Sequence, residues 1–374
     1  MDVFKKKIIP VVYFPEEIES SHYIGEVFGI YVENTYSFNI VSTQKAKNVC
    51  KLGEIFMEKP VLPASADGSE MPCLVGFWEN NKLKFIHFPV LKECKQELYM
   101  LKMDVFSRNT GILESDIMLS KGAMLVGCGS VGSLVALELA RAGVGRFMLI
   151  DNDILGYHNI CRHQCGILDV GKYKVDAVKE RILKINPNAK IITQNRIIQE
   201  VPLAILEEFC DENVIVIGGA DNREGDLYAN KIAQEAGMAL MSIGCWERAF
   251  AGEIFYCLPK GMPTYADFMA ITGDTSGRVN QNRKFYTNEE DLEKAAFEPG
   301  ISADINFVTI IAVKMTLDIL NIGNPSYTTR LLDGLSQYTL VCNTNKTEIG
   351  GDMAEIFSYP LQVTTSIEVP YAKQ

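Results

Sequence analysis

The chain has 374 residues, enough for two or three domains, and its 47% hydrophobic and 22% charged residues are typical of a packed globular protein. A formal net charge of −11 argues against a broad nucleic-acid-binding surface. The ten cysteines have scattered, irregular spacings, which are not those of a disulfide framework and favour a reducing, cytoplasmic compartment.

Residues 1–100 are expected to form a small α+β domain of unknown role. Strand character is found in the short runs VVYF, EVFGIYVE and SFNIVST. Residues 73–78 and 82–88 flank the polar turn ENN, which predicts a β-hairpin, and residues 91–106 have helical character. The chain starts with MDVFKKKIIP, which becomes polar and charged too early to resemble a signal peptide.

Residues 101–374 are expected to form a second, larger domain of the α/β class. From about Lys121 onward, amphipathic helices alternate with apolar strands, which are AMLVGCG, RFMLID, KIITQ, NVIVIGG and ALMSIG. This alternation predicts a Rossmann-like, doubly wound parallel sheet. Ligands of such sheets bind at the carboxyl ends of the strands, so functional residues are expected there.

The last part of this domain departs from the alternation. Residues 259–300 are long, polar and rich in turn residues, which indicates a functional or disordered crossover-type loop. Residues 303–321 predict a buried helix, because their apolar run includes Lys314 and Asp318 and is too short to span a bilayer. Residues 326–374 contain the strand-like runs QYTLVC and PLQVTTSIEV, which are expected to extend or close the sheet.

A glycine-rich loop follows the first strand of the larger domain. Gly127, Gly129 and Gly132 give the spacing G-x-G-x-x-G, and the helix after them would direct free N–H groups at a phosphate. Asp151 ends the next strand, where it can accept hydrogen bonds from a ribose. Glycines that only permit close strand–helix packing would not explain this order of strand, loop, helix and acid. The pattern predicts a nucleotide site but does not separate NAD from ATP.

The segment after Asp151 separates the two nucleotides. It carries four short motifs, which are Asp151-Asn152-Asp153, Asn159-Ile160-Cys161-Arg162, Gly171-Lys172-Tyr173-Lys174 and Ala220-Asp221-Asn222. In this order and spacing the chain resembles the adenylyltransferase superfamily of the ubiquitin-activating enzymes, over roughly residues 105–325. That superfamily includes the bacterial enzymes that adenylate sulfur-carrier proteins for molybdopterin and thiamin synthesis. One departure is His163, which stands where glutamine is common.

The resemblance implies a reaction in which a carboxylate attacks the α-phosphate of ATP and pyrophosphate leaves. Arg162 would grip phosphate oxygens, Lys174 would place a positive charge on the transferring group, and Asp221 would hold Mg²⁺. Each cation taken alone could equally be ordinary surface charge, and Asn159 could be only a turn residue. The other implied nucleotide-binding residues are Gly127, Gly129, Gly132, Asp151, Asp153, Asn159 and Asn222.

An arginine before the glycine loop gives an expectation about assembly. Residues 106–109, FSRN, resemble the R-Y-S-R-Q element of bacterial family members, whose arginine reaches the γ-phosphate in the partner subunit. The resemblance gives that role to Arg108 and implies a homodimer. The alternative is an exposed arginine on a connecting segment.

Cysteine and histidine give two weaker signals. His158, Cys161, His163 and Cys165 are types that bind zinc, but they lie within the expected nucleotide loop. Family members often hold zinc with two C-x-x-C pairs, and this sequence contains no C-x-x-C, so no zinc is expected. Cys245 lies at a strand end where it could form a thioester with the activated acyl group, although small cysteines inside α/β cores are far commoner.

The resemblance implies an ATP- and Mg²⁺-dependent adenylyltransferase that activates the C-terminal carboxylate of a ubiquitin-like or sulfur-carrier protein. The lack of a zinc pair and the extra N-terminal domain fit a specialised bacterial relative, such as one from a ubiquitin-like conjugation system used against phage. Two alternatives stay open. One is adenylation of a peptide or small-molecule carboxylate by the same fold, and the other is an inactive scaffold half of a heterodimer. Retention of Arg162, Lys174 and Asp221 favours an active enzyme.

Overall fold

The computed structural model places its residues in two compact units, Met1–Val105 and Phe106–Gln374. Each unit is described by itself. The residues that the structure describes are 9–45, 49–62, 73–88, 90–100, 104–220, 223–272 and 299–360.

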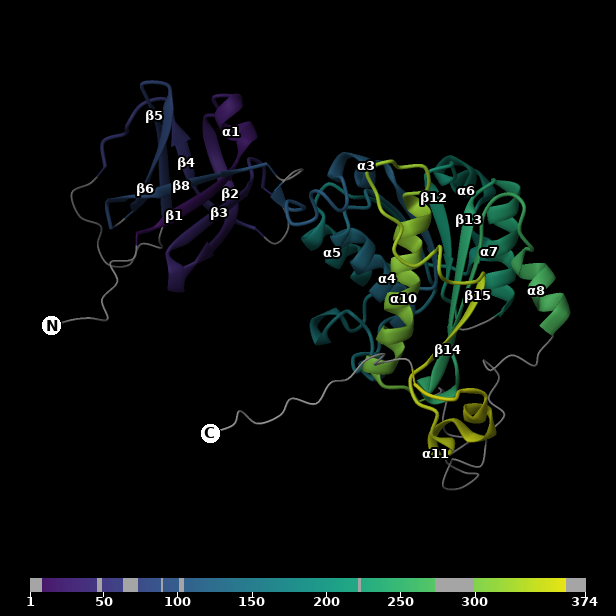
Figure 1. The fold of residues 1–374 in the computed structure, drawn as a ribbon. Helices are drawn as coiled ribbons and strands as arrows, with labels where there is room; N and C mark the ends of the chain where they lie inside the picture. Colours follow the sequence, from purple (N-terminus) through teal and green to yellow (C-terminus); the bar gives the residue numbers. More distant parts are fainter. Residues whose placement is uncertain are drawn as a thin grey trace, which may run out of the picture. The chain divides into compact units, whose positions relative to one another are not determined.

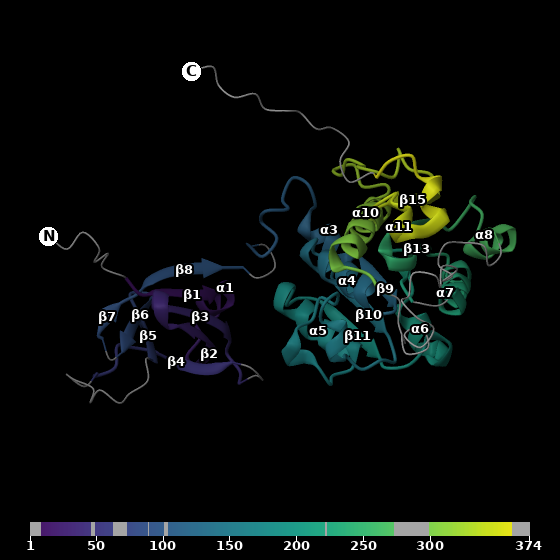
Figure 2. The ribbon, with the colours of Figure 1, turned by 90° about the horizontal axis from the view of Figure 1, so that it is seen from below.

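The first unit is built on one eight-stranded sheet with the strand order β7-β6-β5-β4-β2-β3-β1-β8 (Figure 2). Alternating apolar residues of these strands, such as Val12, Phe38 and Phe85, are fully buried in a single core. Its elements are β1 (Val11–Pro15), α1 (Glu16–Ser20), β2 (Gly25–Val32), the 3-10 turn Glu33–Thr35, β3 (Ser37–Ser42), β4 (Cys50–Phe56), β5 (Cys73–Glu79), β6 (Lys82–Phe88), β7 (Lys92–Glu93) and β8 (Lys95–Tyr99).

The predicted hairpin in this unit is confirmed. Strands β5 and β6 pair antiparallel from Cys73 opposite Phe88 to Glu79 opposite Lys82. The two turn residues, Asn80 and Asn81, both have positive φ angles, of 51° and 62°. This left-handed pair is the geometry of a type I′ turn, which asparagine tolerates better than most residues and which matches the strand twist.

The helical character expected for residues 91–106 is wrong for residues 92–99. Residues 92–93 and 95–99 form strands β7 and β8, and β8 pairs in parallel with β1, from Val11 opposite Lys95 to Pro15 opposite Tyr99. Local helix propensity is a weak preference, and pairing with a strand more than 80 residues away overrides it here. The first unit is therefore rich in β-structure.

The second unit confirms the Rossmann-like α/β class. Its seven-stranded sheet has the order β11-β10-β9-β12-β13-β14-β15, in which the first five strands are parallel and the last two antiparallel. The strand order reverses between β9 and β12, which is where such sheets bind ligands. The strands are β9 (Gly122–Val126), β10 (Arg146–Ile150), β11 (Lys190–Gln194), β12 (Val214–Gly218), β13 (Ala239–Cys245), β14 (Ala251–Cys257) and β15 (Tyr338–Cys342).

Helices cover both faces of this sheet (Figure 1). On one face α10 lies against α4, and α4 against α5, while α6, α7 and α8 pack on the other face. Every residue of β9, β12 and β14 is buried as a result. The helices are α3 (Ser115–Ser120), α4 (Ser130–Arg141), α5 (Lys174–Ile185), α6 (Leu203–Phe209), α7 (Arg223–Glu235), α8 (Tyr265–Thr272), α10 (Ser302–Leu320) and α11 (Thr347–Gly350), with 3-10 turns at Tyr157–Asn159, Ile167–Asp169, Ile198–Glu200, Glu247–Ala249 and Gly351–Ile356.

Two expectations for the C-terminal part are confirmed. The helix predicted over 303–321 is α10, which is largely buried, and the run QYTLVC forms β15 at the sheet edge. No helix in the described part of the chain is long and apolar enough to cross a membrane. Most of the loop predicted over 259–300 lies outside the described residues, as does the run PLQVTTSIEV apart from its first residue.

Candidate functional site

A cavity of about 790 Å³ lies at the carboxyl ends of β9, β10, β12 and β13, around the point where the strand order reverses. This is the position at which doubly wound sheets bind nucleotides, and the volume is within the range of small-molecule sites. Residues from widely separated motifs line it, among them Gly127, Gly129, Ser130, Asp151, Asp153, Arg162, Lys174, Arg196, Gln199, Ala220, Arg223, Glu224, Cys245 and Ile305.

The three positions of the loop require glycine for different structural reasons. Gly127 has a φ of +100°, and a Cβ there would lie 2.8 Å from the carbonyl oxygen of Gly219. A Cβ on Gly132 would lie 1.9 Å from the carbonyl oxygen of Gly127, so this glycine permits the close approach of helix to loop. A Cβ on Gly129 would meet no atom within 4 Å, and Gly129 lines the cavity. Only Gly129 therefore keeps space open for a ligand.

Helix α4 (Ser130–Arg141) starts directly after this loop, at the wall of the cavity. Its first residues, Ser130 and Val131, line the cavity. The first N–H groups of a helix have no partner within the helix, and they carry the positive end of its dipole. The start of α4 can therefore bind phosphate oxygens through main-chain donors.

Asp151, directly after β10, lines the cavity and binds the main chain of the glycine loop. Its Oδ2 accepts the N–H of Cys128 at 2.7 Å, and its Oδ1 accepts the N–H of Asp153 at 2.8 Å. Burial raises the pKa of this carboxyl group, while the two N–H donors and the charge of Lys174 lower it. A carboxylate that is partly removed from water gains from further donors, so it suits the hydroxyl groups of a ribose.

Lys174 is the first residue of α5, and its ammonium group is held at the cavity by Asp153. The Nζ atom lies 2.7 Å from Asp153 Oδ2, and the main-chain N–H of Lys174 donates to the Asp153 carbonyl at 2.9 Å. The lysine side chain is 11% exposed and the aspartate 61%, so the carboxylate is the partner that water can reach. A bound phosphate oxygen can therefore replace the Asp153 carboxylate as the partner of the Lys174 ammonium group.

Arg162 also lines the cavity, and the residue that places its segment is Asn159. Asn159 caps the 3-10 turn Tyr157–Asn159, with its Oδ1 accepting the N–H of Gly156 at 2.9 Å. Its carbonyl accepts the N–H groups of Arg162 at 3.0 Å and His163 at 2.8 Å. Asn159 itself is not among the cavity-lining residues, so its place in the structure is that of a turn residue that orients Arg162.

The remaining predicted residues fall into three groups. Gly132 and Arg108 do not line the cavity, and Arg108 is exposed. Cys245 is half-buried at the end of β13 and does line it. Asp221 and Asn222 lie outside the described residues, but the residues on either side, Ala220 and Arg223, both line the cavity. Within the described residues, no group of three or more His, Cys, Asp or Glu side chains could hold a metal ion.

Two cavity-lining arginines were not predicted. Arg196 follows β11 at its carboxyl end, and Arg223 begins α7 directly after the Asp221-Asn222 pair. Their positions just after strand ends could have marked them as cavity residues, but only with knowledge of where β11 and β12 lie in the sheet. Together with Arg162 and Lys174 they make the cavity wall rich in cations, as a polyphosphate requires.

Comparison with known protein families identifies a match. The sequence model of the ThiF family matches residues 111–341 of this chain. The tRNA threonylcarbamoyladenosine dehydratase of Bacillus subtilis is 45% identical over 69 residues, covering 18% of this chain and 27% of that protein. A protein of Porphyra purpurea named "Probable molybdopterin-synthase adenylyltransferase" is 30% identical over 161 residues, which cover 42% of this chain and 40% of that protein.

A third relative is the ubiquitin-like modifier-activating enzyme 5 of Aedes aegypti. It is 27% identical over 165 residues, covering 41% of this chain and 41% of the relative. The matched region thus spans less than half the length of each of these three curated relatives. The residues that match the family model include the glycine loop and all the residues that line the cavity.

Proposed function

The chain belongs to the ThiF family of adenylating enzymes, and from this premise we propose that it uses ATP to adenylate the C-terminal carboxylate of a ubiquitin-like or sulfur-carrier protein. The observation that carries the proposal is the convergence of Gly129, Arg162 and Lys174 on one cavity. These residues come from three separate motifs, and a site for transfer of a nucleotidyl group needs a phosphate cradle and cations together.

ATP would lie with its ribose on Asp151 and its phosphates on the start of α4. The reaction forms a bond between a carboxylate oxygen of the substrate and the α-phosphorus, and it breaks the bond to the β-phosphate. Negative charge develops on the leaving pyrophosphate, where Arg162 can bind two oxygens through its planar fork. Lys174 can move from Asp153 to a phosphate oxygen, because Asp153 is exposed enough for water to solvate it once it is released.

Mg²⁺ would be held by Asp221, and the wall of the cavity suits a hard cation. Carboxylate oxygens are the ligands that Mg²⁺ prefers, and Asp153 and Glu224 line the same cavity. When bound, Mg²⁺ neutralises phosphate charge and orients the triphosphate.

Three further parts of the proposal concern assembly and surroundings. In a homodimer, Arg108 would contact the γ-phosphate of the ATP that is bound in the partner subunit. This role agrees with the exposure of Arg108 and with its absence from the cavity wall of its own chain. Cys245 would accept the acyl group only as a minor route. A cytoplasmic location is supported by the ten free cysteines. The proposed setting is a bacterial ubiquitin-like conjugation system used against phage.

Isotope exchange between pyrophosphate and ATP tests the proposal. Exchange that depends on a carrier protein ending in glycine supports it, and removal of that terminal glycine must abolish the effect. Exchange that depends instead on a short peptide or a small carboxylic acid would replace the proposed substrate class. A chain that binds ATP but exchanges with no carboxylate would indicate the scaffold alternative.

A further inference from the structure

The imidazole ring of His163 connects the glycine loop to the segment that carries Arg162. His163 is 7% exposed. Its Nε2 lies 2.8 Å from the carbonyl oxygen of Cys128, which stands between Gly127 and Gly129. Its Nδ1 lies 3.0 Å from the main-chain N of Cys165, three residues after Arg162. One buried side chain therefore joins two segments that both line the cavity.

The two contacts fix the protonation state of the ring. A main-chain N–H can only donate, so Nδ1 must accept from Cys165 and carries no proton. A carbonyl oxygen can only accept, so Nε2 must carry the proton and donate it to Cys128. His163 is thus the neutral Nε2–H tautomer, and both of its ring nitrogens are satisfied.

We propose that His163, in this neutral form, is a positioning residue that fixes the Arg162 segment against the glycine loop and so assembles the phosphate site. The inference rests on the proposed function for its ATP readout, but the hydrogen-bond clamp itself does not depend on it. His163 does not line the cavity, so it acts through Cys128 and Arg162 and not by touching the nucleotide.

The clamp should fail when the ring is protonated. An imidazolium has a proton on Nδ1 as well, and that proton would point at the N–H of Cys165. Burial lowers the pKa of His163 first of all, and the carbonyl of Cys128 raises it. The charged groups that act on the ring are Lys174 and Arg181, which lower its pKa, and Asp169, which raises it; its two main-chain partners, Cys128 and Cys165, carry thiols.

Acidification should weaken the clamp, because folding lowers the pKa of His163. The folded state binds a proton at His163 less readily than the unfolded chain, whose histidine has the ordinary pKa of 6.5. The contribution of the clamp is therefore fully present above pH 6.5 and is lost as the pH falls from there towards the lowered pKa of the folded state.

Three variants test the proposal. His163→Gln offers an amide N–H to Cys128 and an amide oxygen to Cys165 without a proton to gain, so it should preserve the site and remove the pH effect. His163→Leu leaves the Cys128 carbonyl and the Cys165 N–H without this partner. His158→Gln is the matched control, because His158 is exposed on the same segment and does not line the cavity.

Binding of a non-hydrolysable α,β-methylene analogue of ATP in the presence of Mg²⁺ is measured by calorimetry from about pH 7.5 down to about pH 4.5, because the folded ring titrates below its ordinary pKa. Protonation of the analogue's terminal phosphate weakens binding in every variant on the acid side, so the readout is the difference between variants. The wild-type chain and His158→Gln should weaken more than His163→Gln once the pH falls to the lowered pKa of the folded ring. Above pH 6.5 His163→Leu should bind about tenfold more weakly than wild type or worse, because two buried groups lose a partner, and this difference should shrink as the wild-type ring is protonated. Analogue binding by His163→Leu equal to wild type above pH 6.5, or the wild-type pH profile in His163→Gln, would overturn the proposal.

The melting temperature without ligand is the second readout, over the same pH range. His163→Gln should remove part of the acid-side fall that wild type and His158→Gln share, and an unchanged fall contradicts the clamp. This measurement decides even where His163→Leu does not fold. A wild-type chain that binds no ATP analogue, but whose acid-side fall depends on His163, would sink the proposed function and leave the clamp standing.

Discussion

Asp151 and His163 each bind one polar group of the same backbone residue, Cys128. The Asp151 carboxylate accepts its N–H at 2.7 Å, and the His163 ring donates to its carbonyl oxygen at 2.8 Å. Asp151 comes from the end of β10 and His163 from the segment after Arg162, so the glycine loop is held by two other segments that line the cavity. Such preorganisation lets main-chain donors face a phosphate without rearrangement on binding.

The first prediction compares two glycines of that loop. Gly129→Ala should leave the melting temperature nearly unchanged, because the added methyl meets no protein atom within 4 Å. The methyl stands at the cavity wall, so affinity for the ATP analogue should fall by about tenfold or more. Gly132→Ala should instead destabilise the fold by about 1–3 kcal/mol, because its Cβ collides with the carbonyl of Gly127.

Melting curves and calorimetric titrations of both variants separate the two effects. If Gly129→Ala bound the analogue as tightly as wild type, the phosphates would not lie on this loop. If Gly132→Ala melted at the wild-type temperature, the close approach of α4 to the loop would not be a constraint.

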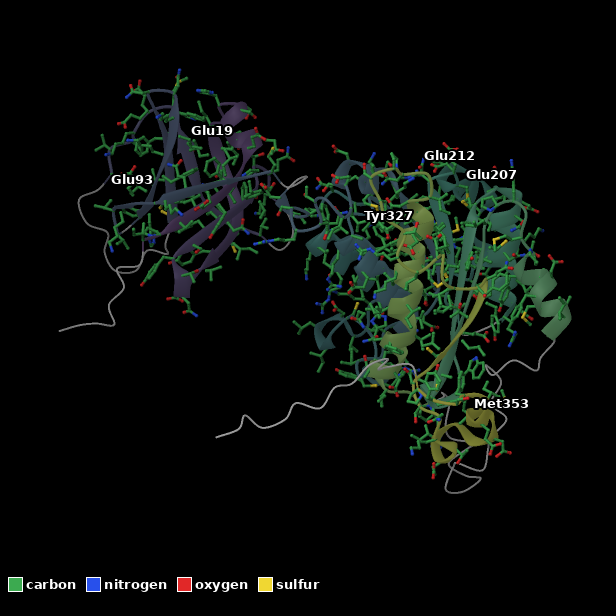
Figure 3. The ribbon with its side chains drawn as sticks, viewed as in Figure 1. Glu19, Glu93, Glu207, Glu212, Tyr327 and Met353 are labelled. Carbon is green, nitrogen blue, oxygen red and sulfur yellow. The ribbon has the colours of Figure 1, made fainter. Side chains whose placement is uncertain are left out.

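The second prediction concerns Asp221. Asp221→Ala should abolish pyrophosphate exchange, because it removes the proposed Mg²⁺ ligand, and it should leave the melting temperature intact because an aspartate contributes no apolar side chain to a core. Glu212→Ala is a suitable control, since Glu212 is an exposed carboxylate before the amino end of β12 (Figure 3). Exchange that persists in Asp221→Ala at saturating Mg²⁺ contradicts the assigned role.

Elements with a local signature could be predicted from the sequence, and elements defined by distant pairing could not. The glycine loop, the Asn80-Asn81 turn and α10 depend on spacing or on turn residues within a short stretch. Strand β8 was mistaken for a helix, because its partner β1 lies at the other end of the first unit's sequence. A single sequence contains no direct record of that pairing.

The same distinction holds for the site. Arg162 and Lys174 could be singled out because they belong to motifs of fixed spacing. Arg196 and Arg223 line the same cavity only because β11 and β12 end at one edge of the sheet. His163 was visible as a departure from a pattern, but its two hydrogen bonds required the fold of the loop around it.

The third prediction tests whether Arg108 acts in the partner subunit. Arg108→Ala and Lys174→Ala should each lack exchange activity. Mixed and allowed to trade subunits, they should regain about a quarter of the wild-type rate, because half of the dimers then contain one site with both residues. If activity stays absent after mixing, Arg108 and Lys174 act in the site of the same chain. If Arg108→Ala alone keeps full activity, Arg108 is only a surface residue.

The last prediction concerns how Asp318 of α10 holds the segment after that helix. Its carboxylate is 2% exposed and accepts the hydroxyl of Tyr327 at 2.6 Å and the N–H groups of Leu331 and Leu332 at 2.7 and 2.9 Å (Tyr327 is labelled in Figure 3). Burial, followed by this hydrogen bond to Asp318, raises the pKa of Tyr327. Asp318→Ala should cost about 2–4 kcal/mol of unfolding free energy, because it leaves several half-buried donors without their acceptor, whereas Tyr327→Phe should cost about 1 kcal/mol.

Urea unfolding in a Trp78→Phe background measures both costs. The chain has two tryptophans, so Trp246 alone then reports on the second unit, and unfolding of the first unit does not contribute to the signal. Because one acceptor serves several donors, the loss in Asp318→Ala should exceed that in Tyr327→Phe by a clear margin. Equal losses in the two variants would show that the main-chain donors of Leu331 and Leu332 find other partners, and that the aspartate serves the tyrosine alone.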